Sequence, residues 1–407
     1  MTSDWKELAL SDITELVIDY RGKTPKKLGG DWSETGYRAL SARNIKTGRI
    51  VQPDTIRYID EEMYRKWMKE EVKRGDILIT SEAPFGQIFF WDSDEKIVLS
   101  QRLFCIRIKP EYDAHFIYYY MTTPEFQGEL DGRATGTTVV GLRQPELMKC
   151  IIHCPKIREQ KAISSILSSI DAKILANEKI NDNLLKQMQL LYFNLLNSCE
   201  CSQIRLEDVS QKIAMGPFGS NIKVSTFVHE GVPIISGNHL RSVFLEEPSY
   251  NYITEEHAQR LKNSIVYPRD IVFTHAGNIG QVAMIPEGCD FPYYMISQRQ
   301  FYMRCDESKV IPEFVLFFFH SRDGKGKLLA NANSTGVPSI AQPSSHLKNI
   351  EMPMPRKADQ DEWYRVIKPM VNMYVTLCKE NKRLSSLRDS LLPRLMSGEI
   401  DVSDIQI

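Results

Sequence analysis

The stretch DILITSEAPFGQ at residues 76–87 occurs a second time, without a gap, as DIVFTHAGNIGQ at residues 270–281. The two copies keep Asp, Ile, Thr, Gly and Gln at equivalent places. Each begins with a run of Ile, Val, Leu or Phe and continues into Gly, Pro or Asn, which is the pattern of a short strand that ends in a turn. The chain therefore contains a duplicated domain, and both copies are predicted to be rich in β-strands.

Further matches lie on both sides of this stretch, each displaced by about 195 residues. That period is too long for a solenoid unit and suits a domain plus a connector. The matches are GYRALSARNI with GVPIISGNHL (36–45 and 231–240), YIDEE with YITEE (58–62 and 252–256), Ser100-Gln101-Arg102 with Ser297-Gln298-Arg299, and Pro155 with Pro353. Their common order indicates that the whole domain was duplicated.

Each copy is followed by a long segment whose apolar residues recur at helical spacing. These residues are Ile157, Ile163, Ile166, Leu167, Ile170, Ile174, Leu184, Leu185, Met188, Leu191 and Leu195 in the first segment, and Trp363, Ile367, Met370, Val371, Tyr374, Leu377, Leu384, Leu387, Leu391 and Leu395 in the second. Two amphipathic helices of roughly 40 residues, about 60 Å long, are predicted. Pro369 is expected to kink the second helix or delay its start, and Pro393 and Gly398 are expected to end it.

The apolar stripe of each predicted helix needs a partner. The simplest partner is the other helix, paired antiparallel as a coiled coil, and the alternative is that each helix packs on its own β domain. The predicted fold is α+β, with two β-rich domains in a pseudo-twofold tandem repeat, separated by two long helices that form an antiparallel coiled coil. The predicted boundaries are 1–155 for the first β-rich domain, 156–200 for a central helical spacer, 201–356 for the second β-rich domain, and 357–407 for a C-terminal helical spacer and tail.

Length and composition suit several packed domains. The chain has 407 residues, of which 42% are hydrophobic and 25% charged, enough apolar material for two or three cores. The formal net charge of -1 argues against a protein that coats nucleic acid non-specifically, although local basic surface can still meet phosphates. Because the sequence has no signal-peptide layout and no apolar run of about 20 residues, we expect a cytoplasmic protein without membrane contact.

The sequence lacks the motifs of common catalytic centres. There is no Gly-x-x-x-x-Gly-Lys-Ser/Thr loop and no Gly-x-Gly-x-x-Gly loop; residues 324–327 (GKGK) are interpreted as a basic turn, and residues 290–293 (DFPY) as another turn. The histidines of the second copy have no nucleophile elbow beside them. The eight cysteines lack the two-residue spacing of structural zinc sites. We expect no catalytic centre, metal or cofactor in this chain.

The chain resembles the specificity subunits of Type I restriction-modification enzymes over almost its whole length. The resemblance is carried by WKELALSDI (5–13), GKTP (22–25), GDI (75–77), the two SQR segments, the Pro-x-x-x-x-Gln lead from Pro155 to Gln160, and LLPRLMSGEIDV (391–402). The second helical segment departs from this pattern, because ADQD at residues 358–361 stands in place of a clean Gln lead.

The resemblance implies that each β-rich domain is a target-recognition domain for one half of a split DNA site, and that the helices set the gap between the halves. It also implies two methylation subunits as partners and, through them, restriction subunits. S-adenosylmethionine, ATP and magnesium would be held by those partners and not by this chain. A different interpretation is a coiled-coil scaffold whose two β domains bind protein partners, and a third is an enzyme whose active site has no recognisable motif.

A protein that reads double-stranded DNA needs cationic groups for phosphates and hydrogen-bonding groups for base edges, and the loops of both copies offer them. Polar residues that differ at equivalent loop positions, such as Asn44 and His239, suit the reading of different bases. The candidate DNA-binding residues are Lys23, Lys26, Lys27, Arg43, Asn44, Gln101, Arg102, Arg133 and Thr137 in the first copy, and Ser220, Asn221, Lys223, Asn238, His239, Arg241, His275, Asn278, Arg299, Lys325 and Lys327 in the second.

Overall fold

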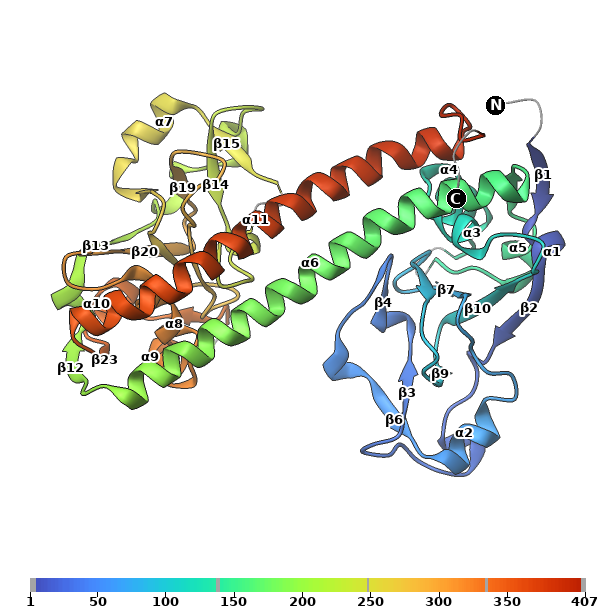
Figure 1. Ribbon diagram of the computed structural model, residues 1–407, viewed down its shortest axis with the longest axis horizontal. Helices are drawn as coiled ribbons and strands as arrows, with labels where there is room; N and C mark the ends of the chain where they lie inside the picture. Colours follow the sequence, from blue (N-terminus) through green and yellow to red (C-terminus); the bar gives the residue numbers. More distant parts are fainter. Residues whose placement is uncertain (1–4, 137–139, 247–248, 334–335, 404–407) are drawn as a thin grey trace. The chain divides into compact units, whose positions relative to one another are not determined.

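The computed structural model describes residues 5–136, 140–246, 249–333 and 336–403 (Figure 1). The chain divides into two compact units: unit 1 contains residues 1–176 and 380–407, and unit 2 contains residues 177–379. Each unit therefore has one β-rich domain and one segment of each long helix. Unit 1 combines both ends of the chain, because Leu10 and Leu395 lie in the same hydrophobic core.

The central sheet of unit 1 is antiparallel, with four strands in the order β2-β10-β7-β8. A smaller sheet has the order β6-β3-β9, in which β3 and β9 are parallel. The pair β1-β11 joins the start of the domain to its end. The strands are β1 Lys6–Ala9, β2 Thr14–Asp19, β3 Tyr37–Leu40, β4 Ile45–Lys46, β5 Arg49–Ile50, β6 Arg57–Ile59, β7 Asp76–Thr80, β8 Ile88–Trp91, β9 Ile97–Leu99, β10 Leu103–Ile108 and β11 Ile151–Cys154.

Unit 2 repeats this topology. Its central sheet has the order β13-β20-β17-β18, its second sheet β15-β14-β19-β16 contains the parallel pair β14-β19, and β12 pairs with β23. The shared topology confirms the duplication. The strands are β12 Ser202–Arg205, β13 Ser210–Met215, β14 Val232–Ile235, β15 Asn251–Ile253, β16 Ile265–Val266, β17 Ile271–Thr274, β18 Val282–Met284, β19 Tyr294–Ile296, β20 Gln300–Cys305, β21 Ala332–Asn333, β22 Ser339–Ile340 and β23 Glu351–Met354.

A buried ion pair recurs at equivalent places in the two central sheets. In unit 1 the Arg107 guanidinium donates to both carboxylate oxygens of Asp76, at 2.9 and 2.8 Å. In unit 2 Arg304 does the same to Asp270, at 2.8 and 2.6 Å. Asp76 is the first residue of β7, and Asp270 directly precedes β17. The aspartate that the two copies share therefore connects the same two strands in each unit, β7 to β10 and β17 to β20.

A close backbone approach explains one matched glycine. Gly36 and Gly231 have φ values of +126° and +149°, and a Cβ atom at these positions would lie 2.2 and 2.3 Å from the carbonyl oxygens of Ile59 and Ile253, respectively. Only glycine fits such a conformation and such a distance. The smaller sheets of the two units are therefore entered by the same tight turn.

Short helices pack around the sheets of both units, and the expectation of mostly β domains did not include them. They are α1 Leu10–Ile13, α2 Glu61–Trp67, α3 Ala114–Met121, α4 Pro124–Arg133 and α5 Gln144–Leu147 in unit 1, and α7 Glu255–Arg260, α8 Pro312–Phe319, α9 Arg322–Leu329 and α10 Pro343–Lys348 in unit 2. Their starts follow ordinary rules: the Thr123 hydroxyl caps α4, whose first residue is Pro124. Each domain is thus an α+β domain in its own right.

The two long helices are α6 Ile157–Ser198 and α11 Lys357–Met396. In unit 1, Asp171 pairs with Arg388 (2.8 Å) and the Ile174 carbonyl oxygen accepts from Asn381 (3.4 Å). In unit 2, Asn181 contacts Cys378, and the rings of Tyr192 and Trp363 lie 6.5 Å apart. In both units, residues further along α6 contact residues that come earlier in α11, so the two helices pair antiparallel as predicted. Each long helix also contributes to the cores of both units, so the alternative, in which each helix packs only on its own β domain, is wrong.

A delayed helix start at Pro369 and a helix end at Pro393 were expected, and both expectations are wrong. Pro369 and Pro393 both lie inside α11, which begins at Lys357 and ends at Met396. Gly398, with a φ of +72°, lies directly beyond the helix end, as its position in the sequence predicted.

The start of α11 corrects the comparison of the two helical segments. In unit 1, Gln160 accepts from the Asp113 backbone N–H (2.9 Å) and donates to the Pro155 carbonyl oxygen (2.8 Å). In unit 2, Gln360 accepts from the Ile311 N–H (3.1 Å) and donates to the Pro355 carbonyl oxygen (2.9 Å). The structural equivalent of Pro155 is therefore Pro355 and not Pro353, and the Gln lead is present in both copies.

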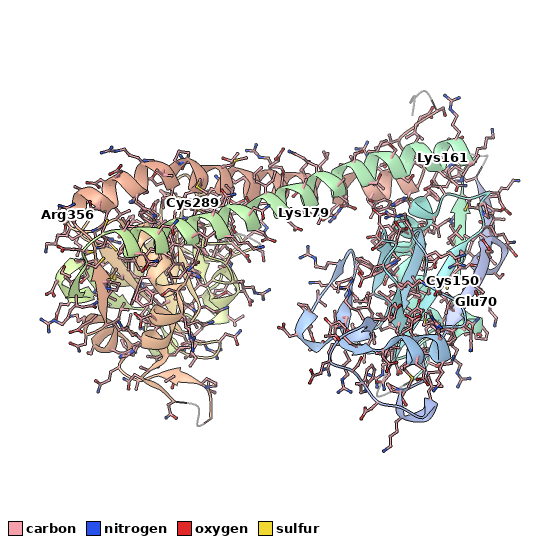
Figure 2. The ribbon with its side chains drawn as sticks, turned by 60° about the horizontal axis from the view of Figure 1, so that its bottom comes forward. Glu70, Cys150, Lys161, Lys179, Cys289 and Arg356 are labelled. Atoms are coloured by element: carbon pink, nitrogen blue, oxygen red, sulfur yellow. The ribbon has the colours of Figure 1, made fainter. Side chains whose placement is uncertain are left out.

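Buried side chains form a large hydrophobic core in each unit, between the central sheet and the helices that pack on it. The core of unit 1 combines Phe116 and Leu167 with Leu395 and Val402. Figure 2 shows the side chains along the ribbon, with Lys161 and Lys179 on α6 and Arg356 close to the start of α11. Among the described residues, no helix combines the length and the hydrophobicity that a membrane span requires.

Candidate nucleic-acid interface

The loop that follows β3 in unit 1 is fixed by one buried side chain. The Asn44 Oδ1 atom accepts from the backbone N–H and the hydroxyl of Ser41, at 3.1 and 2.8 Å. Its Nδ2 atom donates to the Gln52 carbonyl oxygen (3.3 Å), and its backbone carbonyl accepts from the Val51 N–H (2.8 Å). Asn44 is only 1% exposed, so its amide positions the loop and does not reach the surface.

His239 holds the equivalent loop of unit 2. Its Nδ1 atom accepts from the Ser236 backbone N–H (2.9 Å), and its Nε2 atom contacts the Ser249 carbonyl oxygen (2.8 Å). The His239 carbonyl accepts from the Glu246 N–H (3.0 Å), and the ring stacks on Tyr250 with the centroids 4.6 Å apart. His239 is 4% exposed. The interpretation of Asn44 and His239 as surface groups that differ in order to read different bases is therefore corrected: in this structure both side chains are turned inward and fix a loop.

Each loop borders a hollow in the surface of its unit. The hollow in unit 1 has a volume of about 570 Å³ and the one in unit 2 about 600 Å³. Their linings include the same loop positions, which hold different side chains: Arg43, Lys46 and Val51 in unit 1, and Asn238, Arg241 and Glu246 in unit 2. We call them hollow 1 and hollow 2. The two hollows therefore share the same arrangement of the backbone, but the side chains that line them differ in chemistry.

The SQR segments abut these loops. The Gln101 carbonyl oxygen accepts from the Ala42 N–H at 3.1 Å. Arg102 is exposed, has a φ of +63°, and pairs with Glu82 at 3.2 Å. In unit 2, Gln298 and Arg299 line hollow 2. The structure therefore brings Asn238, Arg241 and Arg299, all predicted as DNA-binding residues, to one hollow, with His239 beneath them.

The turn after β17 adds a further predicted residue to this region. The His275 N–H donates to the Arg299 carbonyl oxygen at 3.0 Å, and the His275 Nε2 atom lies 3.1 Å from the Gln298 carbonyl oxygen. Burial lowers the pKa of the His275 imidazole. Asn278, in the same turn, is exposed. In unit 1 the equivalent turn contains Ser81, whose N–H donates to the Arg102 carbonyl oxygen at 2.9 Å.

Other predicted residues of unit 1 lie on different elements. The Lys23 ammonium donates to the Trp67 carbonyl oxygen (2.7 Å), and burial lowers its pKa. Lys26 and Lys27 are exposed on a single 3₁₀ turn that follows it. Arg133, at the end of α4, pairs with Glu129 at 2.8 Å. Thr137 lies outside the described residues.

The predicted residues between β13 and β14 lie on a segment with unusual exposure. Asn221 and Lys223 are exposed, and so are the apolar residues Phe218 (74%) and Val224 (82%). The side chain of Ser220 lies outside the described residues.

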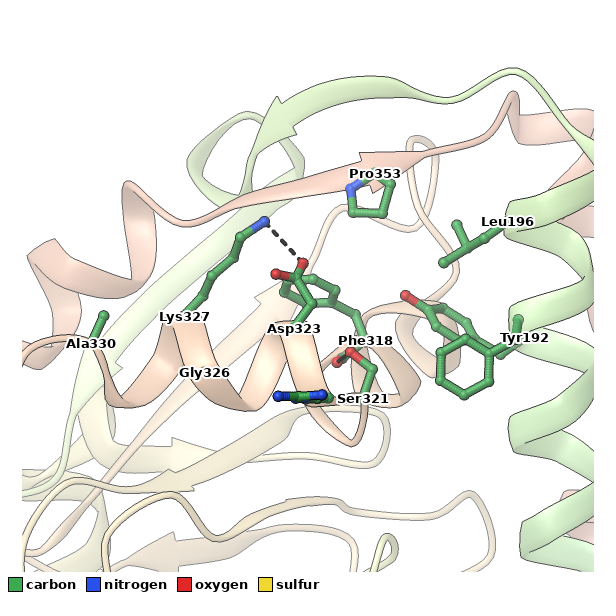
Figure 3. Close-up of a pocket in the computed structure, with 11 residues that line it drawn as sticks. Tyr192, Leu196, Phe318, Ser321, Asp323, Gly326, Lys327, Ala330 and Pro353 are labelled. Carbon is green, nitrogen blue, oxygen red and sulfur yellow. Dashed lines mark hydrogen bonds and ion pairs between the residues drawn. The ribbon is translucent and has the colours of Figure 1, made fainter.

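Lys325 and Lys327 are part of helix α9, so the interpretation of residues 324–327 as a basic turn is wrong. Lys327 pairs with Asp323 at 3.0 Å (Figure 3). It also donates to the Glu351 carbonyl oxygen at 3.0 Å. It lines a third hollow of about 670 Å³, together with Tyr192, Phe193 and Leu196 of α6 and Pro353 of β23. We call this the helix-side hollow; its walls are largely aromatic and aliphatic.

Sequence analysis missed Lys46, Glu246 and Gln298 in the two hollows. Lys46 and Glu246 lie only a few residues beyond the end of the matched stretches 36–45 and 231–240, so extending that alignment would have found them. Among the described residues, no group of three or more His, Cys, Asp or Glu side chains is arranged to hold a metal ion.

Comparisons with known proteins give this geometry a context. Residues 2–186 match the family model described as the Type I restriction modification DNA specificity domain. These residues, somewhat less than half of the chain, therefore carry a Type I restriction modification DNA specificity domain. The matched residues include the first β-rich domain, hollow 1 and most of α6.

Three curated specificity subunits of Type I restriction enzymes are similar to this chain. The MjaIX subunit of Methanocaldococcus jannaschii is 21% identical over 99% of this chain and 95% of its own length. The MjaVIII subunit of the same organism is 27% identical over 51% of this chain, and the EcoBI subunit of Escherichia coli is 25% identical over 53%. The chain spans about half the length of these last two relatives, 48% and 44%.

A solved structure shares the fold. The S subunit of a Type I restriction-modification system from M. genitalium superposes with a TM-score of 0.62 at 15% identity, and the match covers 97% of both chains. The predicted resemblance to Type I specificity subunits and the predicted α+β fold of this chain are therefore confirmed.

Proposed function

We propose that this chain is the specificity subunit of a Type I restriction-modification enzyme, that it binds double-stranded DNA at a bipartite site, and that each β-rich domain reads one half of that site. The pair of equivalent hollows carries the proposal. A duplicated domain that bound one small ligand twice would keep the same side chains at both sites. Here the frame is kept by Asn44 and His239, whereas Arg43 and Asn238 differ at the surface.

The side chains around the hollows fit the two tasks of a DNA reader. Arg43 and Lys46 in unit 1, and Arg241 and Arg299 in unit 2, provide cations for phosphates or for guanine edges. Asn238 supplies an amide that can donate and accept at adenine. Asn238 accepts from Arg241 at 2.9 Å, so each helps to orient the other.

Protein partners are proposed for the long helices. In unit 2, Leu190 and Phe193 of α6 and Val366 and Met373 of α11 are exposed. The helix-side hollow adds an apolar surface beside Phe193. Exposed apolar faces of this kind mark protein contacts. We propose that they receive the methylation subunits, which in turn bind restriction subunits, and that a purified chain without partners aggregates.

The chemistry of the complex is assigned to these partners. S-adenosylmethionine would be held by the methylation subunits, and ATP and magnesium would act with the restriction subunits. The specificity subunit would select the DNA sequence and take no part in methyl transfer or cleavage. We propose the bacterial or archaeal cytoplasm as its compartment, since the DNA substrate is there.

The test is a selection experiment. The full chain, alone and co-produced with its methylation subunit, is mixed with a randomised duplex library at moderate salt, and the retained DNA is sequenced. The expected result is a motif of two short halves separated by a gap of fixed length. If no motif is recovered under either condition, the DNA-reading function is refuted and a coiled-coil scaffold that binds proteins becomes the better explanation.

A further inference from the structure

The internal duplication allows the two hollows to be compared position by position. The N–H of Val51 and the N–H of Glu246 each donate to the carbonyl of the buried residue that fixes the loop, at 2.8 and 3.0 Å. The backbone therefore holds these two side chains in the same way. Val51 lines hollow 1 and Glu246 lines hollow 2. One position thus has an apolar group in one domain and a carboxylate in the other.

A carboxylate is an unusual group to find where DNA binds, because the DNA phosphates repel it. Glu246 is the sole acidic residue among the described residues that line hollow 2, and the same lining contains Arg241 and Arg299. The parts of duplex DNA that attract a carboxylate are the amino groups on the base edges, which in the major groove are N4 of cytosine and N6 of adenine. The position of Glu246 is therefore explained if a base edge, rather than the backbone of the DNA, enters hollow 2.

The surroundings of Glu246 make such a contact selective. Glu246 is exposed, although the protein around it desolvates part of the carboxyl group; this burial raises its pKa, while Arg241 and His239 lower it. A partly desolvated acceptor loses more free energy when its partner is missing than a fully hydrated one does. A base with a carbonyl in place of the amino group would leave Glu246 facing another acceptor.

We propose that Glu246 is a specificity-determining residue, which accepts a hydrogen bond from the exocyclic amino group of a base in the half-site read by unit 2. Val51, at the same position in unit 1, makes an apolar contact instead, of the kind that favours the thymine methyl group. The inference rests on the proposed DNA-reading function. It adds which loop position reads a base and what chemistry that base has.

The experiment compares selected motifs of variants with that of the full wild-type chain, each co-produced with the methylation subunit. In E246A the preference for an amino-bearing base at one position of one half-site should fall by roughly 5- to 150-fold, the range of a single base contact. In E246Q the preference should fall less, because the amide oxygen still accepts while the amide nitrogen can donate to a carbonyl. The other half-site should not change.

Two further variants keep the test decisive. Glu230, a carboxylate of the same unit whose side chain is 91% exposed, is not among the residues that line hollow 2, so E230A should leave the motif as it is. V51E places a carboxylate in hollow 1 and should move one position of the first half-site toward amino-bearing bases. Thermal melting of each variant shows that the fold is intact, and V51E tests the same idea if E246A does not fold.

The outcomes separate the two proposals. If the wild-type chain selects a bipartite motif and both E246A and V51E select the same motif, the role of this loop position is refuted and the DNA-reading function stands. If the wild-type chain selects no motif, the DNA-reading function itself has failed. A motif that changes at one position in E246A and at the equivalent position in V51E supports the inference.

Discussion

Asp76 and Asp270 perform the same structural task, and removal of either carboxylate should cost much of its unit's stability. The side chain of Arg107, which pairs with Asp76, is only 14% exposed, so D76A leaves a buried guanidinium without its counter-charge. A loss of about 3–5 kcal/mol in the free energy of unfolding is expected. R65A is the matched control, because Arg65 pairs with Glu61 at the surface and should contribute at most about 1 kcal/mol. Urea unfolding of both variants measures the difference; equal losses would contradict it.

A second residue-scale prediction concerns pH. Burial lowers the pKa of His320, whose Nε2 atom lies 2.9 Å from the Val282 carbonyl oxygen. Below the ordinary value of about 6.5 the unfolded chain takes up a proton that the folded chain resists, so the free energy of unfolding falls as the pH falls. The slope per histidine is at most about 1.4 kcal/mol per pH unit, and it ends at the lowered pKa of the folded state.

The variant H320N tests this by removing the titrating group. Urea midpoints measured from about pH 8 down to about pH 5 should fall less steeply with pH for H320N than for the wild-type chain. H229N is the control, since the side chain of His229 is 98% exposed and makes no such buried contact. An unchanged slope in H320N would show that another group causes the acid sensitivity.

Sequence analysis found the loops of the interface but not the direction of each side chain. Asn44 and His239 were predicted at the DNA because they are polar and differ between copies. Both stand three residues after a serine, the spacing at which a side chain can cap a backbone N–H of its own turn, and that contact buries them. Their neighbours Arg43 and Asn238 point outward. A sequence gives the polarity of a loop residue, whereas its direction depends on the turn that it helps to form.

At the scale of elements, Asp171 connects three helices of unit 1. Its carboxylate accepts from the Tyr119 hydroxyl of α3 (2.7 Å) and from Arg388 of α11 (2.8 Å). D171A should lower the free energy of unfolding by about 1–3 kcal/mol, since the Tyr119 hydroxyl loses a charged partner where the side chain is buried. R388A should cost less. A double-mutant cycle by urea unfolding should give a positive coupling between the two residues; simple additivity would mean that the ion pair contributes nothing.

The long helices show which element-scale features a sequence reveals. The apolar spacing correctly predicted α6 and α11 and their antiparallel pairing. The delayed helix start expected at Pro369 was wrong, although a proline inside a helix costs about 3 kcal/mol. Trp363, Ile367 and Val371 are buried on both sides of it, and each such side chain contributes about 1.5–3 kcal/mol. The short helices α3 and α8 were missed because their runs of Tyr and Phe, buried on all sides, have no helical period to recognise.

At the scale of the whole molecule, the duplication predicts that the two half-sites respond separately. R43A should weaken binding and reduce the slope of log K against log salt by about 0.9 if Arg43 neutralises one phosphate. In the selected motif, changes should be confined to the half-site of unit 1. R299A should do the same for the half-site of unit 2. R65A, a surface arginine on α2, serves again as the control and should leave both the slope and the motif unchanged; an effect of R43A on both halves would contradict independent reading.

The composition of unit 1 has a consequence for how the protein is made. Its core includes Leu395, Met396 and Val402, which leave the ribosome almost 400 residues after the first strand. Unit 2 consists of one continuous stretch, so its residues are all available earlier. During synthesis the first domain must therefore wait, with part of its apolar surface uncovered, until the last turn of α11 arrives. A nascent chain that stalls shortly before this point would complete its second half and leave its first half open to chaperones and proteases.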